Sequence, residues 1–449
     1  MEQDEEDPKE RHRRPQRAMQ VMVSIRCRLA RLIEFLGLKR SIVGLLSMAV
    51  LVGMGENMAE QFLPLYLIAL GGGFISVGFL NGLDNLMGAL YSFPGGYLSD
   101  RLGTKRALLL FNMLSVAGFA LVAAVPVWPA VLGGAILFLS WSAISLPATM
   151  GLLARVLPKN KRTMGVSMHS LVRRVPMALG PLLGGLLIGV WGVELGVRVA
   201  FVAALALAVI AALLQQLLIE NDRVKQDAPA STPQRNPLRL WAEMKGDLRS
   251  LLVADILVRF CEQIPYAFVV IWAVGTTQPS GQGHPGPVSA VQFGLLRTIE
   301  MATASLIYLP VAYLADRSNK KPFVVMTFSF FTFFPLVLLF SRSFELLILA
   351  FILRGLKEFG EPTRKALIME LAPEGRKAGM FGLYYLIRDV IVSLAAFAGA
   401  FLWQIGPEVN LLTAFAFGAA GTIWFAWQGK DLDKSITAQA SPLGEKAST

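Results

Sequence analysis

The chain has 449 residues, of which 54% are hydrophobic and only 16% are charged, and its mean hydropathy is +0.55. Soluble domains carry charged residues at about a quarter of their positions, so this composition excludes a soluble globular protein. The net charge of +11 does not indicate a nucleic-acid partner, because the Lys and Arg residues lie in short segments between apolar stretches.

Apolar stretches of about 20 residues follow one another nearly end to end, and a helix needs about that length to cross a bilayer. A membrane β-barrel would show short segments of alternating polarity instead. The predicted fold class is therefore an all-α membrane protein embedded in the lipid bilayer. We place twelve spans at roughly 41–70, 76–98, 105–125, 129–156, 163–191, 195–219, 248–275, 289–314, 322–341, 345–371, 377–403 and 409–428.

Residues 1–40 are interpreted as a basic cytoplasmic tail. Acidic residues are followed by basic ones, without the apolar core and cleavage site of a signal peptide. Between Ser24 and Arg40, apolar residues recur at helical spacing among basic ones, which is typical of a helix lying on the membrane surface. A basic extension of the first span would explain this pattern equally well.

The longest polar stretch between spans covers residues 220–247 and contains several prolines, which is typical of a linker. The sequence therefore predicts an N-terminal six-helix bundle at 41–219 and a C-terminal one at 248–428, followed by a cytoplasmic tail at 429–449. Basic residues gather in alternate loops, while the opposite loops hold essentially Arg342 alone. The positive-inside rule then places both termini and the linker in the cytoplasm, with the protein in the cell (inner) membrane.

Polar residues recur at matching positions of the two bundles. Glu56 in span 1 matches Glu262 in span 7, and Asp84 in span 2 matches Glu300 in span 8. Two parallel repeats around an axis normal to the membrane are the architecture that this pattern predicts.

Ionisable residues inside spans are costly and usually face a protein interior or a water-lined cavity. Spans 3, 6, 9 and 12 carry almost none, so we expect them to face lipid while the other spans surround a central cavity. The candidate cavity residues are Glu56, Asn57, Glu60, Asn81, Asp84, Arg173, Arg259, Glu262, Arg297, Glu300, Arg354, Lys357, Glu358, Glu361, Arg388 and Asp389. Buried salt bridges would explain many of them, but burying ion pairs costs several kcal/mol per ion, which favours a role in transport.

A short basic turn between spans 2 and 3 carries a spaced motif, Gly96-x-x-x-Asp100-Arg101-x-Gly103-x-Lys105-Arg106. With its spacing intact, the motif resembles the signature loop of the major facilitator superfamily, and a weaker copy after span 8 keeps Asp316 and Arg317. The resemblance covers about residues 40–430 and implies twelve helices in two pseudo-symmetric bundles that work as a secondary transporter. It also implies that Arg155 neighbours Asp100 in a gate on the cytoplasmic side; a well-formed turn without a gating role is the alternative.

Span 5 contains Gly180-Pro181-Leu182-Leu183-Gly184-Gly185, which is similar to the core of a motif found in the family's drug/proton antiporters. Leu171 stands where that motif has an upstream glycine. A helix-packing seam of small residues explains the stretch nearly as well.

The functional prediction is a secondary transporter, not an enzyme, that moves a small polar or charged solute by alternating access. Proton coupling is expected, with efflux by antiport slightly favoured; proton-coupled uptake and facilitated diffusion are the alternatives, and a non-transporting receptor or scaffold is a different class. No cofactor or metal site is expected, and the protein should be a monomer.

The coupling carboxylate should gain and lose a proton as the site changes its exposure. Our first candidates for it are Glu56 and Asp84, followed by Glu60, Glu262 and Glu300. Bases that could anchor a carboxylate or phosphate, or serve as counter-charges, are Arg173, Arg297, Arg354 and Arg388. His169 is interpreted as either a proton relay or a structural residue.

Overall fold

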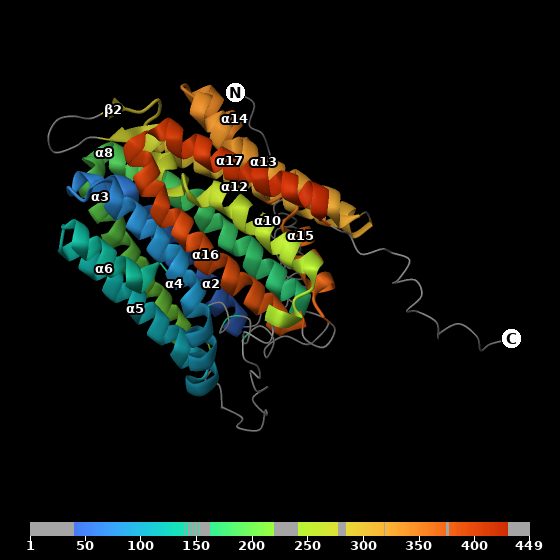
Figure 1. Cartoon of the computed structure of the whole chain (residues 1–449). Helices are drawn as coiled ribbons and strands as arrows, with labels where there is room; N and C mark the ends of the chain where they lie inside the picture. The colour runs from blue at the N-terminus through green and yellow to red at the C-terminus, as the bar shows by residue number, and fades with distance from the viewer. Residues whose placement is uncertain are drawn as a thin grey trace, which may run out of the picture.

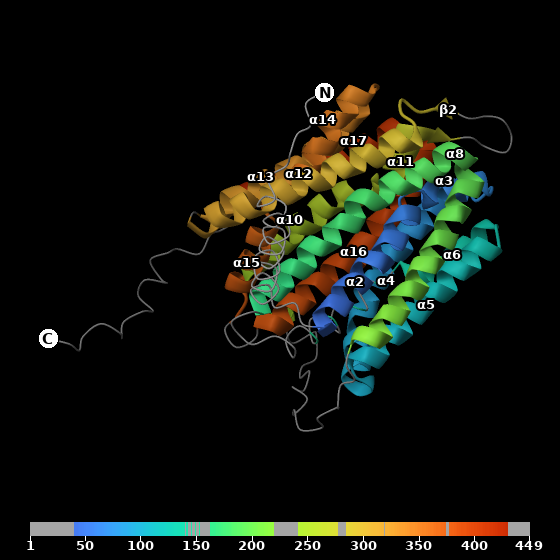
Figure 2. The ribbon, with the colours of Figure 1, turned by 180° about the vertical axis from the view of Figure 1, so that it is seen from behind.

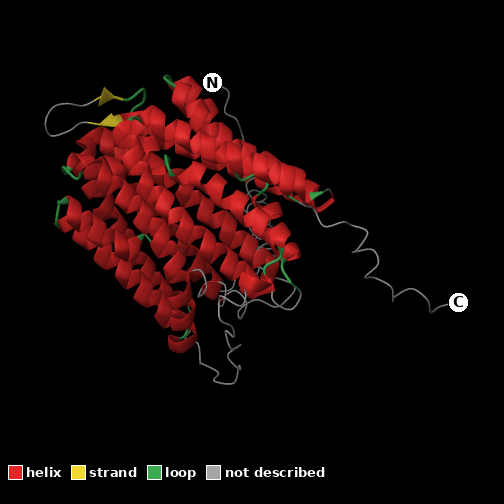
Figure 3. Ribbon diagram, viewed as in Figure 1, coloured by secondary structure: helices red, strands yellow, loops and turns green. Residues whose placement is uncertain are grey.

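The computed structural model of the chain is almost entirely helical (Figures 1 and 3). It describes residues 40–139, 141, 145, 149, 152, 162–219, 241–276, 284–317, 319–373 and 377–429. The predicted all-α membrane fold is confirmed by these helices and by their apolar composition. The surface helix expected between Ser24 and Arg40 lies outside the described residues, except for Arg40, where the first described helix begins.

The helices before residue 220 cover the first six predicted spans. They are α2 (Arg40–Glu60), α3 (Leu63–Ala69), α4 (Gly73–Leu102), α5 (Thr104–Ala124), α6 (Trp128–Phe138) and α8 (Arg162–Leu218). The single long element α8 contains two spans, because Gly192 turns the chain between them with φ +76° and ψ 176°. A positive φ is readily adopted only by glycine.

The helices after residue 240 cover the last six predicted spans. They are α10 (Gly246–Gln263), η2 (Tyr266–Phe268), α11 (Val269–Val274), α12 (Ala290–Arg317), α13 (Lys320–Phe340), α14 (Phe344–Leu356), α15 (Glu361–Leu371), α16 (Lys377–Ile405) and α17 (Pro407–Gln428). Two short strands, β1 (Gly275–Thr276) and β2 (His284–Pro285), pair antiparallel between α11 and α12. Each has two residues, and they were not predicted.

Seven segments of the described chain are long and apolar enough to cross a membrane, by length and composition. One of them, Val172–Leu218, contains two spans, and α4 and α12 are long enough at 30 and 28 residues. Span 4 lies partly outside the described residues, and span 10 is divided between α14 and α15. Eleven of the twelve predicted spans therefore correspond to these elements and span 4 does so only in its described part, while the bundle boundaries at 219 and 248 stay predictions.

Spans 1, 7 and 10 are broken near their middles. The break in span 1 separates α2 from α3, in which Pro64 occupies the first turn. In span 7, Pro265 precedes the 3-10 turn η2, and in span 10 a turn at Gly360 separates α14 from α15. Proline lacks a backbone N–H, so it favours helix starts and breaks over helix interiors. Broken helices are typical of solute sites in transporters.

Two helix pairs join the N-terminal helices to the C-terminal helices: α8 packs along α12, and α4 packs along α16 (Figures 1 and 2). Small residues permit the close approach. A Cβ atom at Gly185 would lie 2.4 Å from the Ala290 carbonyl oxygen, and one at Gly78 would lie 2.4 Å from the Ala400 Cβ. Close helix contacts through small residues are typical of membrane proteins.

Burial separates the predicted lipid-facing spans from the others only in part, because the most apolar window is 50% buried in α13 (span 9) and 44% buried in α16 (span 11). In α17, the last span, 33% of the most apolar window is buried, against 67% in α2. Large side chains on α17 and α13 lie open, such as Trp427 at 85% and Phe340 at 70% exposure. Such exposed apolar faces suit contact with hydrocarbon.

Candidate functional site

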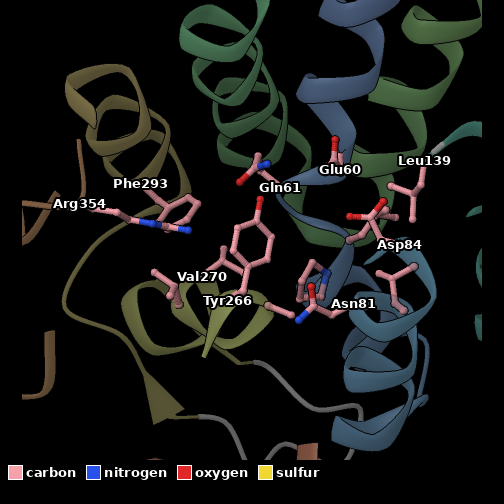
Figure 4. Close-up of a pocket in the computed structure, with 14 residues that line it drawn as sticks. Glu60, Gln61, Asn81, Asp84, Leu139, Tyr266, Val270, Phe293 and Arg354 are labelled. Carbon is pink, nitrogen blue, oxygen red and sulfur yellow. The ribbon is translucent and has the colours of Figure 1, made fainter. Parts of the chain in front are cut away.

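A small cavity of about 40 Å³ lies between the N-terminal and the C-terminal helices (Figure 4). This volume has room for a few water molecules, so a solute would enter only when the walls of the cavity move apart. The cavity begins where spans 1 and 7 are broken. Helix ends and turns therefore form part of its wall, in place of continuous helix. Its lining residues are Glu60, Gln61, Leu63, Pro64, Leu80, Asn81, Asp84, Leu139, Tyr266, Ala267, Val269, Val270, Phe293 and Arg354.

The breaks in spans 1 and 7 place two different polar groups at the same repeat position. When Glu56 is aligned with Glu262, Glu60 at the end of α2 corresponds to Tyr266 at the start of η2. Both side chains line the cavity (Figure 4). The duplicated scaffold therefore contributes a carboxylate from one half and a phenol from the other.

The N-terminal wall of the cavity is acidic. Glu60 on α2 and Asp84 on α4 lie close enough to interact electrostatically, and both line the cavity. Among the described residues, no ion pair or hydrogen bond is recorded for either carboxylate. Beside them, Asn81 donates its side-chain N–H to the Gln263 carbonyl oxygen at 3.1 Å, which links α4 to the end of α10.

The C-terminal wall carries Arg354 of α14. Its side chain is buried at 5% exposure, and its guanidinium lies 5.4 Å from the Tyr266 ring centroid and 5.1 Å from that of Phe334. Aromatic faces attract and orient a guanidinium. Its Nε lies 3.5 Å from Glu300 Oε1, and no hydrogen bond to a described residue is recorded for its Nη atoms. The guanidinium therefore presents donors to the cavity.

Behind Arg354, ten charged side chains form what we call the ion-pair chain. In order they are Arg297, Glu300, Lys357, Glu262, Arg259, Glu361, Arg364, Asp255, Arg388 and Asp389. It connects α10, α12, α15 and α16, and Lys357 follows directly on α14. These residues therefore form salt bridges, as one of the two interpretations predicted. Arg354 differs from them because it also lines the cavity.

The geometry within the ion-pair chain is close. Arg297 Nη1 lies 2.5 Å from Glu300 Oε2, and Lys357 Nζ lies 2.7 Å from Glu262 Oε1. Arg259 Nη1 lies 2.6 Å from Glu262 Oε2. Because each of these carboxylates is held by two or more bases, Glu262 and Glu300 are better suited to structure than to proton exchange with the cavity.

Sequence reasoning missed Asp255 and Tyr384. Asp255 is 1% exposed, pairs with Arg364, and accepts a hydrogen bond from the Tyr384 hydroxyl at 3.0 Å. Its side chain also lies 3.5 Å from Arg388 Nη1. The signal was present in the sequence, because Asp255 stands one helical turn before Arg259 on the charged face of span 7.

Three of the predicted cavity residues on the N-terminal helices lie away from the cavity. Glu56 is buried at 5% exposure and interacts electrostatically with Arg173, and neither lines the cavity. Asn57 donates to the Gly53 carbonyl oxygen of its own helix at 2.8 Å. Arg173 and His169 instead line a smaller space of about 10 Å³ among the N-terminal helices.

The remaining candidate, Glu358, lies 3.7 Å from Arg174 of α8, an ion pair that crosses between the N-terminal and the C-terminal helices. Among the described residues, no group of three or more His, Cys, Asp or Glu side chains gathers as a metal site would.

The signature loop forms the predicted tight turn. Gly103 joins α4 to α5 with φ +80° and ψ 154°, and Lys105 donates to the Gln216 carbonyl oxygen at 2.7 Å. Arg101 and Arg106 are exposed. Arg155 lies outside the described residues. The side-chain surroundings of the other gating candidates, Gly96, Asp100, Asp316 and Arg317, are also outside what the structure describes.

The glycine-rich stretch of span 5 is a packing seam. A Cβ atom at Gly184 would lie 2.0 Å from the Met58 carbonyl oxygen, and one at Gly180 would lie 2.7 Å from the Asn57 Cβ. Pro181 contributes its backbone to a close contact with Gly294 of α12. The seam therefore holds α8 against both α2 and α12, as the packing interpretation of this stretch predicts.

Paired broken helices around a central cavity are typical of membrane transporters built from two helical repeats. The chain belongs to the major facilitator superfamily, whose sequence profile matches residues 45–281 and 256–446. An uncharacterized MFS-type transporter of Methanocaldococcus jannaschii, MJ1317, is 22% identical over 368 residues, which is 80% of this chain and 87% of the relative. The uncharacterized MFS-type transporter YqjV of Bacillus subtilis is 33% identical over 135 residues, 29% of this chain and 32% of that protein.

Solved transporter structures share the fold. A crystal structure of the nucleoside transporter NupG superposes with a TM-score of 0.72 at 14% identity, covering 87% of this chain and 100% of that one. A crystal structure of the peptide transporter POT in complex with sulfate superposes with a TM-score of 0.69 at 14% identity, covering 89% and 95%. These neighbours show the shared fold, and membership of the family supports a secondary transporter for small molecules.

Proposed function

We propose that this protein exports a small polar or charged solute in exchange for protons, through the cavity between its N-terminal and C-terminal helices. The observation that carries the proposal is the pair of cavity carboxylates, Glu60 and Asp84. Neither forms an ion pair or a hydrogen bond among the described residues, and Arg297, which acts electrostatically on Glu60, is itself paired with Glu300. A carboxylate in a cavity can bind either a proton or a cationic group of a solute, but not both at once. Competition for the same site yields exchange in opposite directions.

Glu60 and Asp84 are better placed to carry the proton than the other candidate acids, Glu56, Glu262 and Glu300. Glu56 interacts with Arg173, while Glu262 and Glu300 each lie within ion-pair distance of at least two bases. Neutralising any of these acids would leave a base without its counter-ion. Glu60 and Asp84 can be neutralised without that cost.

The proton gradient supplies enough energy for such an exchange. Each pH unit contributes about 1.4 kcal/mol per proton. Each charge that crosses 100 mV contributes about 2.3 kcal/mol. Concentrating a solute tenfold costs about 1.4 kcal/mol, so one proton per cycle suffices.

Alternating access would be a rocking of the N-terminal helices against the C-terminal helices. Contacts that cross between them would break and re-form. On one side of the cavity, Phe62 packs edge-on against Phe293 with ring centroids 5.8 Å apart. The Arg174–Glu358 ion pair crosses elsewhere. We propose that both termini and the signature loop face the cytoplasm, with that loop and Arg155 forming the gate, and that the protein acts as a monomer in the cell membrane.

The test is proton movement in liposomes that contain the purified protein and an internal pH dye. Amino acids, amines and organic acids are added one at a time, and a coupled solute should shift internal pH. Glu60→Gln and Asp84→Asn should abolish this shift, whereas Glu408→Gln, a change at a carboxylate that is 57% exposed, should preserve it. Solute movement that leaves internal pH unchanged, or that is unaffected by both cavity variants, would overturn proton coupling through this pair.

A further inference from the structure

We infer that the solute is a small zwitterion, whose ammonium group binds at Glu60 and Asp84 while its carboxylate binds at Arg354. The inference rests on the proposed transport through this cavity and names the class of solute. It follows from a separation of charge across the cavity: two carboxylates on one wall, and a buried guanidinium on the opposite wall (Figure 4).

The acidic wall has the chemistry of an ammonium site. Glu60 and Asp84 come from different helices, α2 and α4, and point into the same cavity (Figure 4). Asn81 adds an amide oxygen, because its N–H is used by the Gln263 carbonyl oxygen. An ammonium group has three donors and no acceptor, so it fits a wall of acceptors with negative charge.

The basic wall has the chemistry of a carboxylate site. Arg354 is buried at 5% exposure and lines the cavity, and three aromatic rings lie within 5.7 Å of its guanidinium carbon. The rings restrict the orientation of the side chain. Its Nη atoms, which have no recorded hydrogen-bond partner among the described residues, form the planar fork that matches a carboxylate.

The charges behind Arg354 keep this wall positive. Glu300 is shared by three bases, because Arg297, Arg354 and Lys357 all lie within 3.7 Å of its carboxylate. The ion-pair chain itself holds five acids and five bases, so the charge of Arg354 is left over as an excess of one positive charge. An anion arriving at Arg354 therefore meets an excess of positive charge.

A solute with one charge leaves the opposite wall unsatisfied. An amine alone would bury Arg354 without an acceptor, and a carboxylic acid alone would face Glu60 and Asp84. Buried polar groups that lose their partner are costly, which is how sites built for a polar group reject analogues without it. Tyr266 stands between the two walls in Figure 4 and lines the same cavity, so the two charged groups of the solute must reach around it.

The first test is a matched series of ligands with the purified full chain. Glycine, β-alanine, 4-aminobutyrate and 6-aminohexanoate vary the distance between the charges, and butylamine and butyrate each carry one charge. At least one zwitterion should raise the unfolding temperature, with an affinity at least about tenfold above both single-charge compounds. A single-charge compound that binds as tightly as every zwitterion, or a series without any effect, overturns the inference.

Three variants assign the binding groups of the solute to the two walls. In Arg354→Gln the zwitterion should no longer bind more tightly than butylamine. In the variant that combines Glu60→Gln with Asp84→Asn, it should no longer bind more tightly than butyrate. Arg354→Lys, which keeps the charge but not the fork, should retain part of the affinity. If Arg354→Gln weakens zwitterion and amine binding equally, Arg354 does not hold the carboxylate.

The second test needs no ligand. In a background with Cys27→Ser and Cys261→Ser, Leu139→Cys near Asp84 and Phe293→Cys near Arg354 report the local potential (Figure 4). The ratio of labelling by a cationic to an anionic methanethiosulfonate should be at least about tenfold higher at position 139 than at position 293. Equal ratios overturn the inference even where proton-coupled transport is observed, so the two proposals fail separately.

Discussion

Replacing Asp255 with asparagine should cost the protein about 3–5 kcal/mol of stability, because it removes the counter-ion of buried arginines. The carboxylate is 1% exposed, and Arg364, its closest partner, is also 1% exposed. Arg388 at 3.5 Å and the Tyr384 hydroxyl at 3.0 Å depend on the same oxygen atom. An amide cannot balance the charge of a guanidinium, so the loss should lie in the range measured for broken buried pairs.

The assay is unfolding of the purified protein in mixed micelles at increasing dodecyl sulfate, followed by tryptophan fluorescence. Glu408→Gln is the control, because its carboxylate is 57% exposed and lies 4.0 Å from Arg342; it should change stability by about 0.5 kcal/mol or less. The double variant Asp255→Asn with Arg364→Gln should lose less than the sum of the single losses, because the arginine left bare is also removed. A loss for Asp255→Asn no larger than that of the control would refute this reasoning.

Of three further predictions, the first two use the same unfolding assay and the third uses transport in liposomes. Gly184→Ala should destabilise the protein by about 1–3 kcal/mol, since its Cβ would press on a backbone carbonyl of α2, while Gly88→Ala, with open space around it, should not. Gly103→Ala should lower the stability by about 1–2 kcal/mol, because an L-residue is strained at the φ of +80° found there. Gly88→Ala is again the control, and equal losses of stability for Gly103→Ala and Gly88→Ala would contradict the strain argument. For the crossing ion pair, Arg174→Glu and Glu358→Arg should each change the transport rate in liposomes, and the double exchange should restore it; failure of that rescue would exclude a gating contact.

The membrane fold could be predicted because bilayer thickness and loop charge leave a direct record in the sequence. The breaks in the helices were harder to predict. Pro64 and Pro265 sit inside long apolar stretches, and a proline inside a membrane span can kink a helix or end it. Only the packing around Glu60 and Tyr266 decides that here the helices end and the cavity begins.

The candidate site could be predicted as a set of residues but not as a set of roles. Helical spacing placed Glu56 and Glu60 on one face of span 1, although one lies beside Arg173 and the other lines the cavity. Which charges are paired depends on contacts between helices that are distant in sequence, such as that between Lys357 and Glu262. The sequence alone carries no measure of those distances.

The ion-pair chain has a consequence for how the C-terminal helices can slide past one another. Acids and bases alternate along most of it, so Lys357 lies between Glu300 and Glu262, and Arg259 lies between Glu262 and Glu361. A base that moves by one position exchanges one carboxylate for the next and is never left bare. We therefore expect these helices to change register by stepwise partner exchange, in which each step costs far less than separating a buried pair outright.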